Sequence, residues 1–194
     1  MNKKDSNSLS YRKDGRTQRQ FERDLKRDTA YEQVAALMIK KNLIHEGKEV
    51  VVKNYGMDNS GDLVIDSNEV NANPDYLFII DRDHHFYEIK VHSDRYPCMS
   101  FKTSNIRSYI KHKAECVIVT ESGYFIFDKD AMLYMVKHCI AKPYRGFAGG
   151  KEAYRLMKPE ILTLVSQDVI KYIKWNAAAL KLFNQYNFIF GSRK

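Results

Sequence analysis

Two short apolar segments separated by a polar run constrain the fold of this chain more than any other feature. Residues 75–80 (DYLFII) and 86–91 (FYEIKV) have the length and the β-branched and aromatic content of strands. The polar run Asp81-Arg82-Asp83-His84 lies between them. Such a run is short enough to join two antiparallel strands. The sequence therefore predicts a β-hairpin with a loop of four or five residues.

The second predicted strand carries two charged side chains on one face. Side chains alternate between the faces of a strand, so Glu88 and Lys90 point one way while Tyr87, Ile89 and Val91 point the other way. Burying a charge is costly unless it is paired or bound to a metal. Two charged residues on one face of an otherwise apolar strand therefore indicate a site.

The hairpin brings a third charged residue to the same face. If the loop is residues 81–84, Ile80 pairs with His85 and Asp75 lies opposite Lys90, with Glu88 one diagonal step away. Diagonal neighbours are about 7–8 Å apart, a distance that two carboxylates can bridge through one cation. A slip of one residue in the register would move Asp75 to the other face.

This set of side chains favours the hydrolysis of a phosphodiester. Two carboxylates suit Mg²⁺, or Mn²⁺ in its place, because such cations prefer oxygen ligands. A metal ion lowers the pKa of its bound water and offsets the charge that builds on the phosphorus centre. Lys90 is expected to orient the attacking water, help to deprotonate it, or hold the phosphate. The plainer alternative is a surface hairpin in which an Asp caps the start of a strand and a Glu and a Lys form a cross-strand pair.

The remaining pattern predicts a domain of helices and strands. A helix is expected from Thr17, whose side chain would form a capping box with Gln20, to about Lys41, either continuous or broken near Asp28–Thr29. Further elements are expected at these residues: a strand at 48–55, a small strand at 63–65, a helix at 104–112, strands at 116–120 and 124–127, and helices at 130–141 and 159–186. This order predicts a three-layer α/β or α+β domain with a mixed central sheet flanked by helices.

Charge divides the chain into three parts. The net charge of +8 arises from basic residues 1–27 and 142–194, whereas residues 28–141 are net acidic. Basic flanks around an acidic centre fit a polyanion-binding protein, although ordinary solubilising charge gives the same pattern. We expect a flexible basic arm at 1–16, a core at 17–141, and a basic helical extension at 142–194 that packs on the core.

Cysteine content and hydropathy indicate a cytoplasmic protein. The three cysteines are widely spaced and form no zinc-binding pattern, so reduced thiols are expected. No apolar run approaches the roughly 18 residues that span a bilayer, and no membrane partner is expected. Asp62 is a candidate for a further metal ligand, and His92, two residues after Lys90, is a candidate for a cleft residue.

Pro74-Asp75 followed by Glu88-Ile89-Lys90 resembles the PD-(D/E)xK signature of the restriction-endonuclease-like nuclease superfamily. The resemblance covers roughly residues 17–127. It implies a restriction-endonuclease-like core and a metal held by Asp75, Glu88 and the carbonyl of Ile89, with Lys90 as a catalytic residue. Many members add a glutamate from the first helix.

For that glutamate, Glu32 is the first candidate and Glu22 the second, although the apolar stripe of Val34, Leu37 and Met38 places Glu32 near the opposite face. In the family, the region after the motif often faces nucleic acid, which here implicates Lys102, Arg107, Lys111 and Lys113. A solvated helix face is the alternative for these four residues.

The expected function is that of a Mg²⁺-dependent DNA endonuclease in recombination, repair or phage DNA metabolism. A structure-selective junction resolvase or an exonuclease of the same fold is an alternative, and so is a non-catalytic nucleic-acid-binding protein. Tyr172, Trp175 and Phe183 have helical spacing and are more typical of packing than of base stacking. A homodimer through the C-terminal region, burying Trp175 and Tyr186, would place two metal sites on one duplex. The alternative is a monomer whose C-terminal helices cover the sheet.

Overall fold

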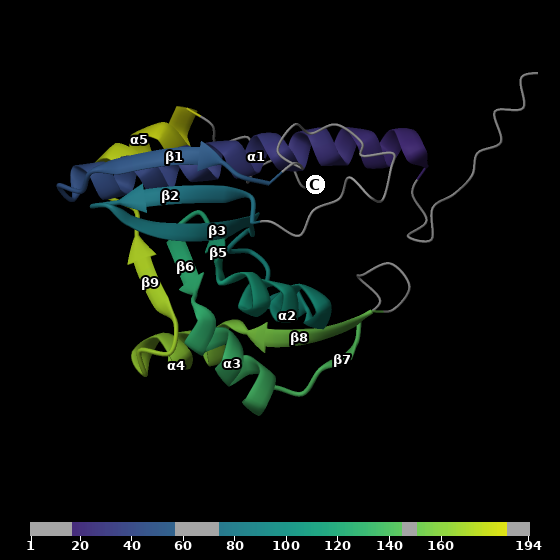
Figure 1. Ribbon diagram of the computed structural model, residues 1–194. Coiled ribbons are helices and arrows are strands. Elements are labelled where there is room, and N and C mark those ends of the chain that lie inside the picture. The colour runs from purple at the N-terminus through teal and green to yellow at the C-terminus, as the bar shows by residue number, and fades with distance from the viewer. Residues whose placement is uncertain (1–16, 57–73, 145–150, 186–194) are drawn as a thin grey trace, which may run out of the picture.

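The computed structural model describes residues 17–56, 74–144 and 151–185 (Figure 1). The predicted arm at 1–16, Asp62, the small strand at 63–65 and Tyr186 lie outside the described residues, as does the side chain of Phe183.

Five helices and nine strands make up these residues. The helices are α1 (Gln18–His45), α2 (Thr103–His112), α3 (Lys129–His138), α4 (Lys158–Ser166) and α5 (Ala177–Gln185). The strands are β1 (Val50–Asn54), β2 (Tyr76–Ile80), β3 (Asp83–Val91), β4 (Cys98–Lys102), β5 (Ala114–Val119), β6 (Gly123–Phe127), β7 (Lys142–Pro143), β8 (Glu152–Met157) and β9 (Lys171–Lys174).

Six strands form the central sheet in the order β1-β2-β3-β5-β6-β9, and β4, β8 and β7 form a smaller antiparallel sheet. The central sheet is mixed, because β3 and β5 run parallel while its other pairs are antiparallel. A parallel pair needs a crossover connection. Here the chain between β3 and β5 contains β4 and α2.

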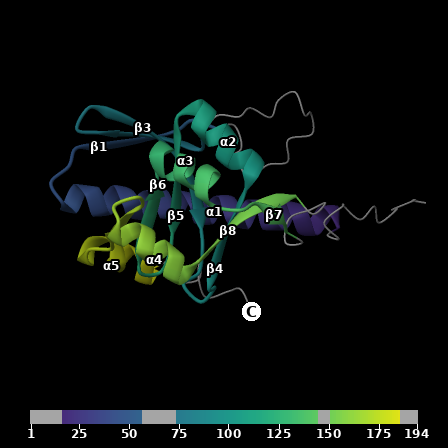
Figure 2. The same cartoon turned by 90° about the horizontal axis from the view of Figure 1, so that it is seen from below.

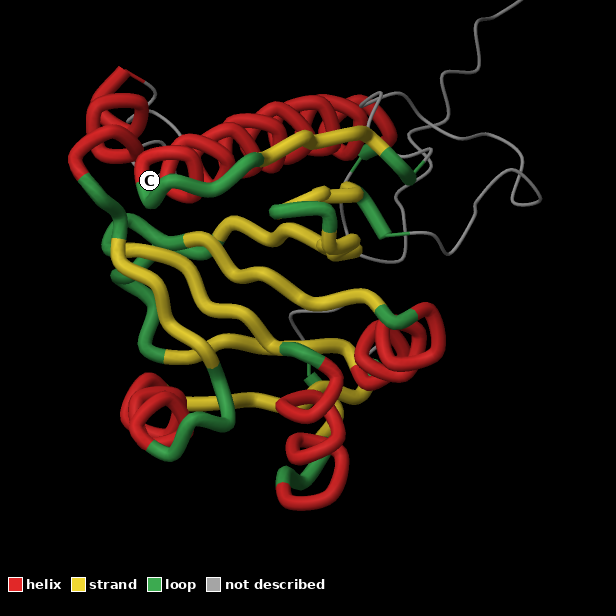
Figure 3. Tube along the Cα trace, turned by 60° about the vertical axis from the view of Figure 1, so that its left-hand side comes forward, coloured by secondary structure: helices red, strands yellow, loops and turns green. Residues whose placement is uncertain are grey.

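Helices cover both faces of the central sheet. Figure 3 shows α1 and α5 on one side and α2, α3 and α4 on the other, and Figure 2 shows the molecule from the side of α3 and α4. Each face has its own buried cluster, one built around Met38, Ile39 and Phe78 and the other around Ile106, Phe127 and Met132. The predicted mixed α/β architecture with a central mixed sheet flanked by helices is confirmed.

The first helix is continuous, and its predicted start is confirmed. Thr17 accepts the Gln20 N–H at 3.2 Å and donates its own N–H to the Gln20 side chain at 2.8 Å, which completes the capping box. The helix runs without a break through Asp28–Thr29 to His45. At about 1.5 Å per residue it is roughly 42 Å long.

The register predicted for the hairpin was wrong by two residues. Ile80 pairs with Asp83, so only Asp81 and Arg82 form the turn. Both have positive φ, 50° and 80°, which is typical of the two-residue turns whose twist suits a hairpin. The Asp81 carboxylate accepts the N–H of Glu49 and pairs with Lys48, which fixes the turn against the entry to β1. A shift of two residues keeps every side chain on its predicted face.

Replacing Arg82 by Gly is expected to stabilise the protein by about 1 kcal/mol, because a residue with a Cβ is strained at positive φ and glycine is not. Urea denaturation of wild type, Arg82→Gly and Arg82→Ala measures the effect. Arg82→Ala removes the same charge but keeps the strain, so it should leave the unfolding free energy nearly unchanged. Equal stabilisation by both variants would assign the effect to the charge.

The predicted long helix at 159–186 was wrong. This segment forms α4, then β9, then α5. Asp168 has a left-handed φ of 57° just beyond the end of α4 and redirects the chain into β9, which pairs with β6. Gly123 allows this pairing, because a Cβ there would lie 2.3 Å from the Ile173 carbonyl oxygen.

The aromatic residues of this segment are used in packing. Tyr172 stacks on Phe125, with ring centroids 4.6 Å apart. Trp175 is only 6% exposed and donates its indole N–H to the Thr120 carbonyl at 2.9 Å. Because Trp175 is buried within its own chain, it offers no surface for the predicted dimer.

Candidate active site

The charged residues of the hairpin gather where β3 extends beyond β2. Because β2 begins at Tyr76, opposite Tyr87, residues 88–91 of β3 pair only with β5 among the described strands. Asp75 directly precedes β2, and its carboxylate accepts the backbone N–H of Ile89 at 3.3 Å. The observed register places Asp75 level with Glu88, and not opposite Lys90 as predicted.

Lys90 lies at the centre of three carboxylates. Its Nζ is 2.9 Å from Glu32 Oε1, 3.2 Å from Glu88 Oε1 and 3.5 Å from Asp75 Oδ2. The carboxylate side chains are between 12% and 18% exposed, whereas that of Lys90 is 41% exposed. The hairpin of β2 and β3 and the distant helix α1 therefore bring four ionisable groups to one sheet edge.

Glu32 reaches this edge because the buried face of α1 differs from the predicted one. Leu37, which the predicted stripe included, is 49% exposed. Ala35 and Ala36, one turn after Glu32, are 2% and 3% exposed and pack on the sheet. Residues three and four apart share a helix face, so Glu32 lies on the covered side of α1. Glu22 forms no contact with Lys90 in the described part of the chain.

Burial and crowding perturb the acid–base chemistry of the cluster. Burial raises the pKa of the Asp75 carboxyl to about 7; the charge of Lys90 opposes this rise, and the charges of Glu88 and Glu32 add to it. Burial also raises the pKa of Glu32, against the opposing effect of Lys90. Burial lowers the pKa of the Lys90 ammonium, but the three carboxylates outweigh it and hold the pKa well above its ordinary value.

Tyr109 on α2 supports the cluster from the opposite side of the sheet to α1. Its hydroxyl donates to Glu88 Oε1 at 2.9 Å and accepts from the Asn105 amide at 3.2 Å. The sequence pattern indicated Tyr109 only as an apolar position of a short helix. Asn105 and Tyr109 are four residues apart, and this spacing could have indicated that they share a polar face of α2.

The donor set fits a hard divalent cation by its chemistry. Asp75, Glu88 and Glu32 offer carboxylate oxygens, and these outnumber the one ammonium among them, so the cluster has an excess of negative charge. The carboxylates converge on Lys90 Nζ, and within the described residues no three acidic, histidine or cysteine side chains are already grouped to hold an ion. Lys90 offsets only part of the negative charge of the three carboxylates.

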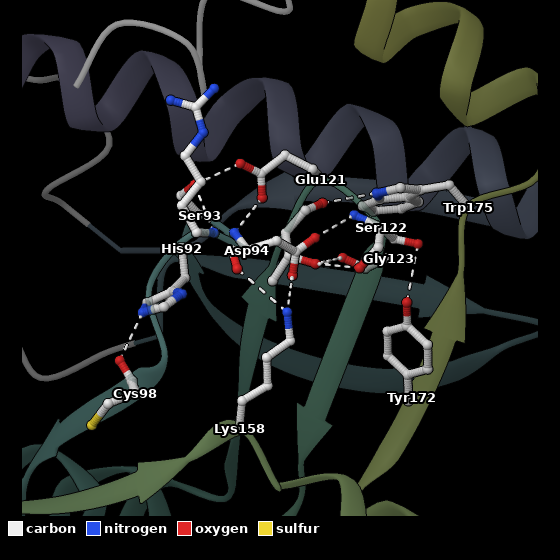
Figure 4. Close-up of polar contacts among 12 residues, drawn as sticks. His92, Ser93, Asp94, Cys98, Glu121, Ser122, Gly123, Lys158, Tyr172 and Trp175 are labelled. Carbon is white, nitrogen blue, oxygen red and sulfur yellow. Dashed lines mark hydrogen bonds and ion pairs between the residues drawn. The ribbon is translucent and has the colours of Figure 1, made fainter. Parts of the chain in front are cut away.

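The chain that follows β3 is held by a second polar network (Figure 4). The Glu121 carboxylate accepts from the Ser93 hydroxyl at 2.6 Å and from the backbone N–H of Asp94. The Asp94 carboxylate accepts from the Ser122 N–H at 2.9 Å, and Lys158 Nζ donates to the Asp94 carbonyl at 3.3 Å. These bonds join the end of β3 to the β5–β6 turn and to α4, and so fix the strand that carries Lys90.

The predicted nucleic-acid-binding residues separate into two groups. Lys102 precedes α2 and lines a cavity that also includes Lys90 and His92. Arg107 and Lys111 are exposed and lie two residues from Tyr109, roughly 160° around the helix axis from it. Lys113 is exposed at the end of α2. Only Lys102 and His92 are therefore brought beside the carboxylate cluster.

Comparison with family models and with curated proteins gives no match. Among solved structures, the chain aligns with Hjc of Archaeoglobus fulgidus, a Holliday junction resolvase from an archaeal hyperthermophile. The alignment covers 84% of this chain and 99% of that chain, with 10% identity and a TM-score of 0.37. A likeness at this level carries no argument about activity. No described helix is long and apolar enough to cross a membrane.

Proposed function

We propose that this protein is a Mg²⁺- or Mn²⁺-dependent nuclease that hydrolyses phosphodiester bonds in DNA. The observation that carries the proposal is the convergence of Asp75, Glu88 and Glu32 on Lys90 at one sheet edge. Asp75 and Glu88, with the carbonyl of Ile89, would hold the metal ion. The resemblance of the sequence to PD-(D/E)xK nucleases and the net charge of +8 of the chain support DNA as the substrate.

Each residue has a role that follows from its contacts. A bound divalent ion supplies an acidified water and neutralises charge on the phosphate. Asp75 is held in place by the N–H of Ile89, and Glu88 by the hydroxyl of Tyr109, so both carboxylates are oriented before a ligand arrives. Glu32 accepts from Lys90 and positions its ammonium. Lys90, the most exposed of the four, is placed to contact a phosphate oxygen or the attacking water.

The surroundings of the Lys90 ammonium favour a catalytic function over simple DNA binding. Phosphate is commonly bound on a surface by exposed lysines and arginines. The Lys90 ammonium instead forms ion pairs with three carboxylates. These carboxylates would repel a phosphate unless a metal cation were also present. A cluster of this composition suits a metal-assisted reaction better than passive DNA binding.

Incubation with supercoiled plasmid, linear duplex, single-stranded DNA and a four-way junction tests the proposal. We expect cleavage with Mg²⁺ or Mn²⁺, none with EDTA, and none by Glu88→Gln under any condition. Glu115→Gln is the matched control, because Glu115 pairs with His85 away from the cluster and its loss should leave cleavage intact. The pattern of products separates an endonuclease from an exonuclease and from a junction resolvase. Binding without cleavage for every substrate and metal would show a non-catalytic DNA-binding protein.

A further inference from the structure

A cavity of about 260 Å³ opens beside Lys90 on the sheet face that α2 covers. Residues of β3 and β5 form its floor, and β4 and α2 form its walls. It is smaller than the roughly 300–1,000 Å³ of sites for drug-sized ligands. Its size therefore suits a single ring system with its attached groups, and not a strand of several residues or a helix.

The cavity and the carboxylate cluster share two residues. Lys90 and Tyr109 both line the cavity, and both contact Glu88, at 3.2 Å and 2.9 Å. A ligand whose phosphate lies at the cluster therefore has its adjoining group at the mouth of the cavity. In a nucleic acid, that adjoining group is the sugar and base of the same or the next nucleotide.

The lining matches the two-sided chemistry of a nucleobase. Met99, Phe101 and Ile118 supply apolar surface, which suits the flat faces of a base. Ser100 and Asn105 supply hydroxyl and amide groups, which suit its polar edge. The two kinds of group line one cavity, as a base that has left its stack requires.

The charge around the cavity suits the backbone of the same nucleotide. Lys102 lines the cavity, and burial together with the nearby charges of Lys151 and Lys90 lowers its pKa. Like charges close together are costly, and a phosphate between them would offset that cost. The cavity therefore combines an apolar interior with a cationic rim.

We propose that this cavity binds one unpaired nucleotide next to the phosphodiester that is cleaved, so that single-stranded or locally unpaired DNA is the preferred substrate. This proposal rests on the proposed nuclease function. A base that is paired and stacked in a duplex cannot enter the cavity without leaving its stack, whereas a bulged or single-stranded base is already free to enter. Stacking and burial of one base should favour the unpaired substrate roughly tenfold to a hundredfold.

Binding with Ca²⁺ in place of Mg²⁺ tests the proposal separately from activity, because Ca²⁺ also takes oxygen ligands and neutralises the carboxylates without supplying the Mg²⁺ or Mn²⁺ that cleavage is expected to need. The probes are two oligonucleotide duplexes that carry 2-aminopurine, one at a single-nucleotide bulge and one at a paired position. Wild type should bind the bulged duplex at least tenfold more tightly, with a change in 2-aminopurine fluorescence that the paired probe lacks. Ser100→Phe should fill the cavity and abolish the preference. Ser104→Phe, at an exposed position of α2 outside the cavity, should keep it.

A second pair of variants covers the case in which Ser100→Phe does not fold, as judged by thermal melting. Lys102→Gln should weaken binding of the bulged probe more than binding of the paired probe, and Lys111→Gln, on the other side of α2, should affect both equally. Equal affinity of wild type for the two probes, or a preference that survives in folded Ser100→Phe or in Lys102→Gln, would overturn the proposal. Cleavage without this preference would leave the nuclease function standing, and the preference without metal-dependent cleavage would leave only the binding site.

Discussion

Replacing Lys90 by Ala is expected to lower the rate of DNA cleavage by roughly 10²–10³-fold, the range seen when one oriented donor is removed from an active site. Lys90 Nζ contacts all three carboxylates of the cluster, and its side chain is exposed enough to reach a phosphate. Its charge should act mainly on charge that develops during the reaction, so DNA affinity should change little. Single-turnover cleavage rates and binding isotherms on the same duplex measure the two effects.

Lys111→Ala is the matched control for this variant. It removes the same charge from an exposed position on α2 that points away from the cluster, and it should leave the cleavage rate within about twofold. If cleavage and binding by Lys90→Ala fell together, Lys90 would be a docking residue. If cleavage were unchanged, the cluster around Lys90 would be a structural ion-pair network.

The sequence predicted the hairpin side of the site because strand periodicity tolerates error in the loop. The predicted turn was two residues too long, which shifted the register by two, yet Asp75, Glu88 and Lys90 still form one cluster because a shift of two preserves the face of each side chain. Positive φ at Asp81 and Arg82 made the turn shorter than a count of polar residues suggested. Neither residue is glycine, so the usual signal for such a turn was absent.

Glu32 shows that the spacing of apolar residues is insufficient to predict which face of a helix is covered. Apolar residues usually mark the covered face of a helix, but here small alanines, Ala35 and Ala36, pack on the sheet and Leu37 is half exposed. Small residues allow α1 to lie close to the sheet, and that closeness lets Glu32 reach Lys90 at 2.9 Å. An apolar count cannot distinguish an alanine that is buried from one that is not, so this contact depended on the tertiary structure.

Strand β9 shows a second limit of prediction from the sequence. Residues 159–186 keep helical spacing of apolar residues, but Asp168 turns the chain and β9 joins the central sheet beside Gly123. A strand of four residues is too short to produce a clear period-two pattern. Its place is set by the partner strand β6 and by the absence of a side chain at Gly123, and both of these lie far away in the sequence.

Replacing Asp75 by Asn is expected to abolish metal-dependent cleavage, by more than roughly 10³-fold, while stabilising the metal-free protein by about 1 kcal/mol. The Asp75 side chain is 12% exposed and lies among the carboxylates Glu88 and Glu32, so its charge is costly in the absence of a divalent ion. An amide oxygen can still accept the N–H of Ile89, and Lys90 keeps its two nearer partners. The variant therefore removes the charge and preserves the local backbone.

Thermal melting with and without Mg²⁺ separates the two parts of this expectation. In EDTA, Asp75→Asn should melt at a higher temperature than wild type. Added Mg²⁺ should stabilise wild type, by about 1.4 kcal/mol at ten times its dissociation constant, and should leave Asp75→Asn unchanged. Asp83→Asn, exposed at the start of β3 in the same hairpin, is the control and should respond to Mg²⁺ as wild type does. An equal Mg²⁺ response in wild type and Asp75→Asn would remove Asp75 from the metal site, and a lower melting temperature for the variant in EDTA would mean that its carboxylate stabilises the fold through Lys90 and Ile89.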